Sequence, residues 1–488
     1  MGRLQLRAWE GDLLRWQETS AKSGYHSVSE WIRQTLNRQS VSAPPGVSVH
    51  GRSILDNGVR VITESVPDTR GLAIGVVLAG GLQHERPGEA GLAHLCQQMV
   101  FRRTAMQDAQ GAARALEAVG GEAGAILSRD HTGLWISVPD ENAYPALDLL
   151  GGLMLRPQFP AKAWDAERSL RLQQIAAAPE QPAKFLREWV RDAGWPGHPF
   201  GINALGYESE VSGLTREQGA ALWERSLQGG NMVVVAAGGV CHEEFASQAN
   251  DVFWPVPPGS AGPCVSSRRL SSTLTIQTLP IQQSHFCIGV PAPGYGQPGA
   301  IIWHVWQKVL GGGVASRLPR QLRECEGVAV DVRTVYQQYG VGGVLWVEGS
   351  TSPAQLLPTV QAVLAELYGL ASNRAPVSEE ELAWARTQVR ADLLRQVNHL
   401  QGRVRKLAWD EMYAGRRISL AGQLKEIEEL RLESIEALRG TLMDRLTSVD
   451  LGVVDPSKPD VPSAKDRAAL PRFLVSFRGR CRRERRRR

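Results

Sequence analysis

The sequence predicts an α+β fold with two similar domains in tandem, preceded by a small separate unit. Strand and helix patterns that begin at Ser53 start again after a Pro-, Gly- and Ser-rich stretch at residues 256–275. The segments WDAERSLRLQQI (164–175) and WARTQVRADLLRQ (384–396) occupy equivalent places in the two halves, which indicates a duplication. The chain's 488 residues are enough for two or three domains with ordinary cores.

Residues 1–40 are expected to form the small unit. Polar and apolar side chains alternate along residues 3–7, which predicts a short strand with one apolar face. A helical pattern follows at residues 10–22, and a capping box at Ser27 and Glu30 opens a second helix. This order resembles the ribbon-helix-helix DNA-binding proteins, and SVSEWIRQTLNR is similar to their second helix.

A unit this small cannot bury a core alone, so we expect it to dimerise by pairing two strands into a ribbon. The resemblance implies that Arg3, Gln5 and Arg7 on the ribbon would enter the major groove of DNA. Arg and Gln suit guanine and adenine edges. The alternative is a dimerisation device that no longer touches DNA.

Residues 41–52 are expected to be a linker, and residues 53–255 the first large domain. An Asn57-Gly58 turn between apolar runs predicts a hairpin. Further elements are expected in order along the chain: strands at 72–78, 121–128 and 132–138, helices at 141–154 and 161–192, and a last strand at 233–237.

After a linker at 256–275, the second domain is expected at residues 276–455. Its expected elements are a strand at 286–290, a helix at 300–310, strands within 328–349 and a long helical run at 379–407. Residues 456–488 are expected to be a Pro-containing tether and an Arg-rich tail. That tail is either solvated and disordered or an arm that binds phosphate without sequence preference.

Composition indicates a soluble globular protein without a membrane span. Apolar residues make up 43% and charged residues 22% of the chain, and no run of about 18 apolar residues occurs. The net charge of +5 comes from residues 472–488, which hold nine Arg and one Glu. Six scattered Cys without a C-x-x-C pair, and a polar N-terminus unlike a signal peptide, favour a reducing, cytoplasmic location.

The stretch EAGLAHLCQQMVFRRT (89–104) carries the most informative polar residues. Its apolar side chains recur at helical spacing, so it predicts a buried or half-buried helix. His94, Gln97 and Gln98 share one face of that helix. A His with two long polar side chains on one face has the geometry of a metal site with a base beside it. Here both partners are amides, which cannot act as bases.

Within this stretch, GLAHLCQQMVFRRT resembles the motif helix of the pitrilysin/insulinase family of zinc peptidases, which carries H-x-x-E-H. The resemblance spans roughly residues 50–450. It includes four further segments in order: SRDHTGLWISV (128–138), GHPFGINALG (197–206), SGLTREQ (212–218) and GGGVASRLPRQLRECEG (311–327). It implies a tandem pair of pitrilysin-type α/β sandwich domains that face each other.

In the family, two His and a later Glu bind zinc, a Glu inside the motif activates water, and a further Glu lies seven residues before the third ligand. The resemblance places His94 and Glu167 at matching positions. Gln97 stands where the base belongs, and Gln98 and Gln174 stand where ligands belong. We therefore expect zinc binding, and with it catalysis, to be lost.

The family also implies a peptide contact through an Arg and a Tyr seven residues apart in the second domain. Arg323 fits the Arg position, but Val330 stands at the Tyr position. Arg323 is therefore a candidate peptide-binding residue. The alternative is an ordinary surface ion pair of Arg323 with Glu324 or Glu326.

Some bacterial members of this family are two-chain peptidases in which one chain lacks the zinc motif. The resemblance thus implies a catalytically inactive subunit that binds peptide and completes the chamber for a zinc-bearing partner. The alternative is a DNA-binding regulator with a peptide-binding body. An active hydrolase with an unusual metal set is a third reading, but the sequence offers no further ligands at suitable spacing.

Overall fold

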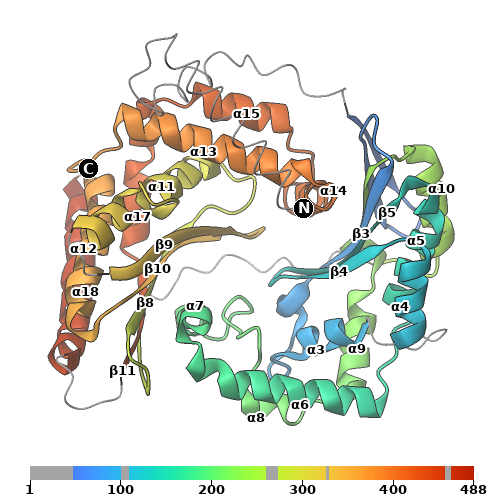
Figure 1. Ribbon diagram of the computed structural model, residues 1–488, viewed down its shortest axis with the longest axis horizontal. Helices are drawn as coiled ribbons and strands as arrows, with labels where there is room; N and C mark the ends of the chain where they lie inside the picture. The colour runs from blue at the N-terminus through green and yellow to red at the C-terminus, as the bar shows by residue number, and fades with distance from the viewer. Residues whose placement is uncertain (1–47, 101–108, 260–272, 326–328, 457–462, 488) are drawn as a thin grey trace, which may run out of the picture. The chain divides into compact units, whose positions relative to one another are not determined.

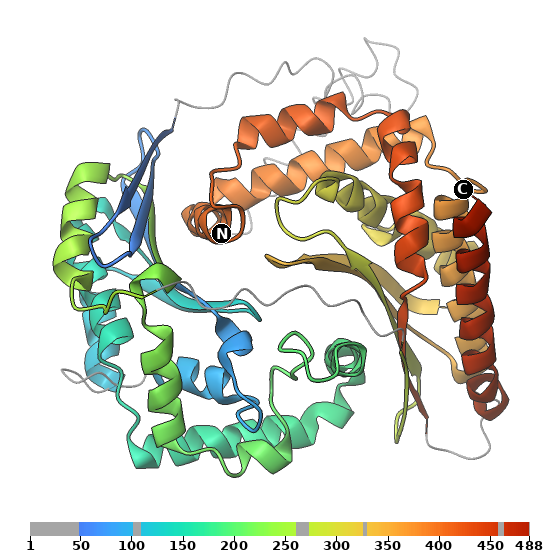
Figure 2. The same ribbon diagram turned by 180° about the vertical axis from the view of Figure 1, so that it is seen from behind.

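The computed structural model describes residues 48–100, 109–259, 273–325, 329–456 and 463–487. Contacts divide the chain into two units, Met1–Ser48 and Val49–Arg488. The expected ribbon-helix-helix unit at residues 1–40, with Arg3, Gln5 and Arg7, lies outside the described residues. The fold below is that of the second unit, in which two sheets are each covered by helices (Figures 1 and 2).

The first sheet has six strands in the order β1-β2-β6-β3-β5-β4. The pairs are antiparallel except β2 and β6, which run parallel. β3 alternates strictly, with Leu72, Ile74, Val76 and Leu78 in the main core of this half and Ala73 and Val77 on the other face. The strands are β1 (Val49–Ile54), β2 (Arg60–Ser65), β3 (Gly71–Ala79), β4 (Glu122–Leu127), β5 (His131–Pro139) and β6 (Met232–Gly238).

The second sheet has five strands in the order β7-β11-β8-β10-β9, with β7 and β11 parallel and the other pairs antiparallel. This order and these directions repeat those of β2-β6-β3-β5-β4. The two halves are therefore tandem copies of one α/β domain, as the sequence predicts. The strands are β7 (Leu274–Leu279), β8 (Ser284–Ala292), β9 (Ala329–Gln338), β10 (Gly343–Thr351) and β11 (Asp450–Pro456).

Helices cover each sheet. In the first half α5 and α10 pack against the sheet, and in the second half α12, α17 and α18 pack together beside β8 (Figure 1). The first-half helices are α3 (Leu92–Val100), α4 (Ala109–Ala118), α5 (Ala143–Leu155), α6 (Ala161–Ala177), α7 (Pro182–Gly194), α8 (Glu208–Val211), α9 (Arg216–Ser226) and α10 (His242–Phe253). The second-half helices are α11 (Ala300–Gly311), the π-helical turn η5 (Pro319–Cys325), α12 (Leu356–Ser372), α13 (Glu379–Asn398), α14 (Leu400–Trp409), the π-helical turn η7 (Asp410–Ala414), α15 (Leu420–Glu429), α16 (Leu432–Ala437), α17 (Arg439–Leu446) and α18 (Ser463–Arg487). Within the described ranges, none of the helices combines the length and the apolar character that a membrane span requires.

The two halves exchange one helix each. α7 of the first half packs on β8 and β11 of the second sheet, and α14 of the second half packs on β3 and β6 of the first sheet. Val190 of α7 is buried with Cys287, Trp346 and Val454, whereas Val404 of α14 is buried against strands of the first sheet. Each sheet thus has one face covered by its own helices and part of the other face covered by a helix from the other half.

Buried ion pairs accompany both exchanged helices. The Arg187 guanidinium of α7 donates to both carboxylate oxygens of Glu348 on β10, at 2.8 and 3.2 Å. Arg403 of α14 donates to Glu64 on β2 at 2.6 Å. Both carboxylates are nearly buried, and Glu348 also accepts from Arg333 at 2.7 Å, so it keeps one cationic partner without Arg187.

Three predicted features are wrong. The expected helix at 161–192 is two helices, because a 3-10 turn at Ala178–Glu180 with its proline, and Pro182 at the start of α7, interrupt it. The expected linker at 41–52 contains the start of β1. β1 is a polar edge strand that is held by its backbone pairing with β2. Its sequence therefore lacks the alternation of apolar residues that would predict a strand.

The expected tail is also wrong, because residues 463–487 form α18. Leu470, Leu474, Phe477 and Cys481 follow helical spacing and lie in the core of the second half. Arg478 donates to the Thr273 carbonyl at 3.2 Å. The many arginines therefore occupy the outer side of an amphipathic helix whose apolar stripe is short and easily missed.

We expect Gly75→Ala and Gly452→Ala to loosen the two exchanged helices. A Cβ at Gly75 would lie 2.6 Å from Val404 Cγ1, and one at Gly452 would lie 2.0 Å from Val190 Cγ2. Overpacking of this kind costs about 1–3 kcal/mol of the free energy of unfolding, measurable by urea denaturation. Gly152→Ala on α5, where nothing lies within 4 Å, is the control and is expected to be neutral or stabilising. Equal effects at all three positions would contradict this packing.

Candidate functional site

Helix α3 carries the motif residues, and two Glu side chains accept hydrogen bonds from the backbone at its beginning. The Ala93 N–H donates to Glu85 Oε1 at 2.8 Å, and the Ala90 N–H donates to Glu210 Oε2 at 2.9 Å. Acceptors at a helix N-terminus satisfy backbone donors that the helix itself leaves free. Burial raises the pKa of Glu85 to about 8, despite these backbone hydrogen bonds. Leu92, Leu95 and Met99 bury the opposite face of α3 in the core.

His94 lies half-buried on the side of α3 that meets α6. Its Nε2 atom is 3.5 Å from the side-chain nitrogen of Gln98, one turn along the helix. Burial and the nearby Arg171 guanidinium lower the pKa of His94 to about 3, so its imidazole is neutral at physiological pH. The neutral ring nitrogen therefore faces an amide where the family's motif has a second imidazole.

The Gln97 side chain is held by a hydrogen bond to the first sheet. Its side-chain nitrogen donates to the Ile126 carbonyl of β4 at 2.6 Å and lies 3.5 Å from Thr132 Oγ1 on β5. The side chain is 2% exposed. The amide thus ties α3 to the edge of the first sheet, and its oxygen is no proton acceptor for water.

Arg171 is the residue that the sequence analysis missed. It lies on α6 between Glu167 and Gln174, at the i, i+4 and i+7 positions that share one helix face. Arg171 is 4% exposed, whereas Gln174 is exposed. Its Nε and Nη1 atoms have no hydrogen-bond partner among the described residues. Burial lowers its pKa, and the carboxylates of Glu167 and Glu85 oppose that shift.

These residues do not fit a zinc ion. His94 is the only imidazole of the predicted set, the Gln97 amide is committed to β4, and a guanidinium lies close enough to His94 to act on it electrostatically. Catalytic zinc sites use three protein ligands, commonly with a carboxylate or thiolate among them, and an adjacent Arg cation opposes binding of the positively charged ion. Among the described residues, no group of three or more His, Cys, Asp or Glu side chains is arranged to hold a metal.

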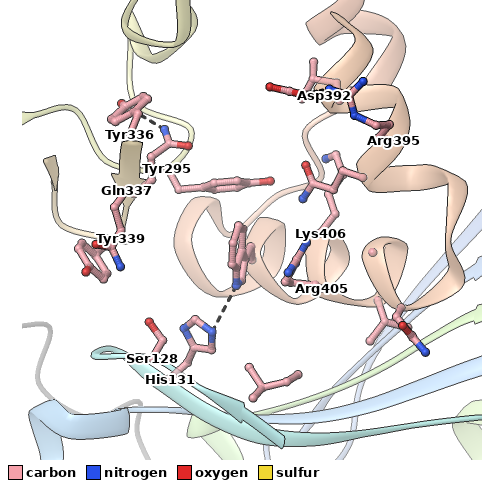
Figure 3. Close-up of a pocket in the computed structure, with 18 of the residues that line it drawn as sticks. Ser128, His131, Tyr295, Tyr336, Gln337, Tyr339, Asp392, Arg395, Arg405 and Lys406 are labelled. Atoms are coloured by element: carbon pink, nitrogen blue, oxygen red, sulfur yellow. Dashed lines mark hydrogen bonds and ion pairs between the residues drawn. The ribbon is translucent and has the colours of Figure 1, made fainter. Parts of the chain in front are cut away.

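A large cavity, of about 770 Å³, lies between the two sheets and α13 and α14. Its walls include two edge strands, β4 of the first sheet and β9 of the second. Figure 3 shows Ser128 and His131 rising from the first sheet, with Tyr295 and Tyr336 on the other side. Arg395, Arg405 and Lys406 add cations to one wall.

A buried network joins the halves at one end of this cavity. Asp130 Oδ1 accepts from Tyr413 Oη at 2.7 Å and lies 3.0 Å from His131 Nδ1. The Trp409 indole N–H donates to His131 Nε2 at 3.3 Å (Figure 3). Burial opposes the charge of Asp130, but hydrogen bonds from His131, Tyr413 and the Gly340 N–H outweigh it and lower the pKa of Asp130. The SRDHT segment thus fixes η7 and α14 against the first sheet.

Arg323 lies on η5 and is exposed. It is not among the described residues that line the large cavity. The side chains of Glu324, Glu326 and Val330 lie outside the described residues, so the choice between peptide contact and surface ion pair stays open. Arg171, by contrast, could have been found from sequence, because it repeats the helical spacing of Glu167 and Gln174.

Two family profiles match the chain in succession. "Insulinase (Peptidase family M16)" matches residues 60–207, and "Peptidase M16 inactive domain" matches residues 213–389. The chain belongs to the M16 peptidase family. The first match contains α3 and α6, and the second contains the large-cavity strand β9. The family that the motif residues predicted is thereby confirmed.

Relatives of this M16 chain are described as uncharacterized zinc proteases. One from Mycobacterium tuberculosis is 28% identical, covering 84% of this chain and 94% of the relative. One from Bacillus subtilis is 24% identical, covering 83% and 98%. The fold is shared with a peptidase M16 inactive domain from Pseudomonas fluorescens (TM-score 0.77, 18% identity, 84% and 98% covered). It is also shared with a protease from Helicobacter pylori (TM-score 0.77, 17% identity, 84% and 100% covered).

We expect the triple variant Gln97→Glu, Gln98→His, Gln174→Glu to bind zinc poorly while Arg171 remains. Adding Arg171→Leu should tighten zinc binding by about tenfold or more, because one positive charge leaves the neighbourhood of the ligands. Zinc per chain, measured by atomic absorption after dialysis, tests this. Arg171→Leu alone is the control and should bind none. Stoichiometric zinc in the triple variant would contradict the role given to Arg171.

Proposed function

We propose that this chain is a catalytically inactive M16 subunit that binds peptide and completes the chamber for a zinc-bearing partner. The observation that carries this proposal is the pairing of His94 with amides and with the buried Arg171. A positioned general base contributes about 10²–10⁴ in rate. Gln97 cannot supply that contribution, since its amide has no accessible proton-accepting group and already bonds β4.

Retention of the pocket's architecture supports binding without hydrolysis. α3 and α6 still pack on each other, and the replacements keep much of the bulk of Glu and His while removing charge. The Gln97 side chain joins α3 to β4 through its hydrogen bond. This packing keeps the shape that a chamber wall needs.

The large cavity offers a means of holding an extended peptide. β4 and β9 are edge strands, and each leaves one row of backbone donors and acceptors without a neighbouring strand in its sheet. A peptide can add to such an edge through main-chain hydrogen bonds. Trp135, Tyr295 and Tyr336 among the lining side chains provide apolar and aromatic surface for its side chains.

The partner we propose is a zinc-bearing relative of the same family. Relatives of this chain are described as zinc proteases, and some bacterial members of the family act as two-chain peptidases. In such a pair this chain would hold peptide, with Arg323 as a candidate contact, and the partner would supply the metal chemistry. The proposal needs no zinc, cofactor or base from this chain.

A reconstitution experiment tests this function. Alone, the purified chain should cleave no peptide, and addition of a zinc-bearing M16 relative from the same cell should produce cleavage above that of the relative alone. Chelation should abolish that cleavage, because the metal belongs to the partner. The variant that combines Gln97→Glu, Gln98→His and Gln174→Glu with Arg171→Leu is a matched chain that tests whether the amides and Arg171 matter. Chelator-sensitive cleavage by the unmodified chain alone would refute the proposal.

DNA binding through residues 1–40 remains a second proposal, compatible with the first in one chain. It rests on the alternation of residues 3–7, which predicts a strand with Arg3, Gln5 and Arg7 on one side. In gel shifts, Arg3→Ala and Arg7→Ala should each weaken binding to a cognate operator by about 1–3 kcal/mol. Arg482→Ala with Arg483→Ala on α18 is the control. Binding that depends only on the α18 arginines would be sequence-blind and would end the operator hypothesis.

A further inference from the structure

The wall of the large cavity that α13 and α14 form carries more cations than carboxylates. Asp392 is the one acidic side chain among the described residues that line this cavity. Two cations share it, because both Lys308, at 2.6 Å, and Arg395 pair with its carboxylate. Lys406, which also lines the cavity, is matched by Asp410 at 2.7 Å. These pairs together leave one positive charge in excess.

Arg405 of α14 adds a further positive charge to this wall. Its side chain is exposed and lines the cavity, and Figure 3 shows it among the side chains around that space. Among the described residues it has no hydrogen-bond or ion-pair partner. Its guanidinium carbon lies over the Trp409 ring, 5.5 Å from the ring centre. Arg405 is therefore a cation that the cavity can offer to a ligand.

The Trp409 ring is a fixed support for this guanidinium. Its indole N–H donates to His131 Nε2 at 3.3 Å, and its ring meets that of Tyr295 edge-on, at 5.6 Å between centroids. A guanidinium over an aromatic ring is attracted by the electrons of the ring. This contact orients Arg405 without using any of its N–H donors, which stay available for a carboxylate.

Other carboxylates near the cavity are already matched by cations. Glu64 of β2 accepts from Arg403 of α14 at 2.6 Å. Asp130, at one end of the cavity, accepts from the Tyr413 hydroxyl at 2.7 Å. It belongs to a buried group of two carboxylates and two guanidiniums without net charge, which consists of Asp130, Glu188, Arg129 and Arg191. The protein thus provides no carboxylate for Arg405 among its described residues.

The edge strand β4 would bring peptide side chains to this wall. Ile126 of β4 packs with Val404 and Leu407 of α14, so its side chain marks the face of the first sheet that α14 covers. Side chains alternate between the two faces of a strand. In a peptide added to the edge of β4, every second side chain would therefore point to the face on which α14 and Arg405 lie.

We propose that the large cavity selects peptides that carry an acidic side chain, Asp or Glu, and that Arg405 pairs with this carboxylate. The inference rests on the proposed peptide-binding function and names its substrate class. A carboxylate can accept two parallel hydrogen bonds from one guanidinium, and it would offset the excess charge of the wall. A Lys or Arg side chain at the same place would meet like charge, which disfavours basic peptides.

A pair of peptides that differ in one side chain tests this selection. A short peptide of Ala, Ser and Gln with one central Glu, blocked at both ends, is compared with the same peptide carrying Gln instead. Calorimetric titration into the full chain at physiological salt should show about fivefold tighter binding of the Glu peptide. Arg405→Gln should remove this preference and leave binding of the Gln peptide unchanged.

Two further variants separate pairing from overall charge and from misfolding. Arg480→Gln is the matched control, because it removes the same charge from an exposed side chain of α18 that does not line the cavity, and it should keep the Glu preference. Arg405→Glu should bind a peptide with a central Lys more tightly than the Glu peptide, which a misfolded chain would not do.

The outcomes also separate this inference from the function on which it rests. Equal binding of the Glu and Gln peptides by the unmodified chain, or a Glu preference that survives in Arg405→Gln, would overturn the role of Arg405 and leave peptide binding standing. If the unmodified chain binds neither peptide nor the Lys peptide, the proposed peptide-binding function fails, and the selection fails with it.

Discussion

The reciprocal burial of α7 and α14 is the constraint on which the rest of the second unit depends. Each helix leaves its own half and packs on the facing sheet of the other, and a glycine on each sheet, Gly75 of β3 and Gly452 of β11, allows the close approach. Burial of apolar side chains contributes roughly 25 cal/mol per Å², and here that contribution joins two halves that each have a separate main core. The two halves of the second unit are therefore packed against each other through α7 and α14.

This exchange also places the candidate sites. α14 ends in η7, whose Tyr413 reaches Asp130 of the first half, while α7 carries Arg187 to Glu348 and Arg191 to Gln337 of the second. The edge strands β4 and β9 are thereby brought to the walls of one cavity.

The motif region places an imidazole, amides and a guanidinium near one another on α3 and α6. His94 is neutral because burial and Arg171 both disfavour its protonation. The Gln97 amide nitrogen donates a hydrogen bond to β4 that holds α3 against the sheet. Arg171 supplies a cation on the face of α6 that carries Glu167, so the carboxylate has a positive neighbour without any metal.

Sequence alone determined the family, the tandem α+β architecture and the position of the motif helix, because hydrophobic period and ordered motifs are local properties of the chain. It also located Gly-rich turns and most strands. The sequence did not predict the polar edge strand β1 or the helix α18. The short apolar stripe of α18 lies among many arginines. Only the tertiary structure decided that α7 and α14 exchange sheets, that Arg171 rather than Gln174 is buried near His94, and that Arg191 donates to Gln337 of the second half. Those contacts join residues far apart in the chain, and no local pattern encodes which distant surface a helix will cover.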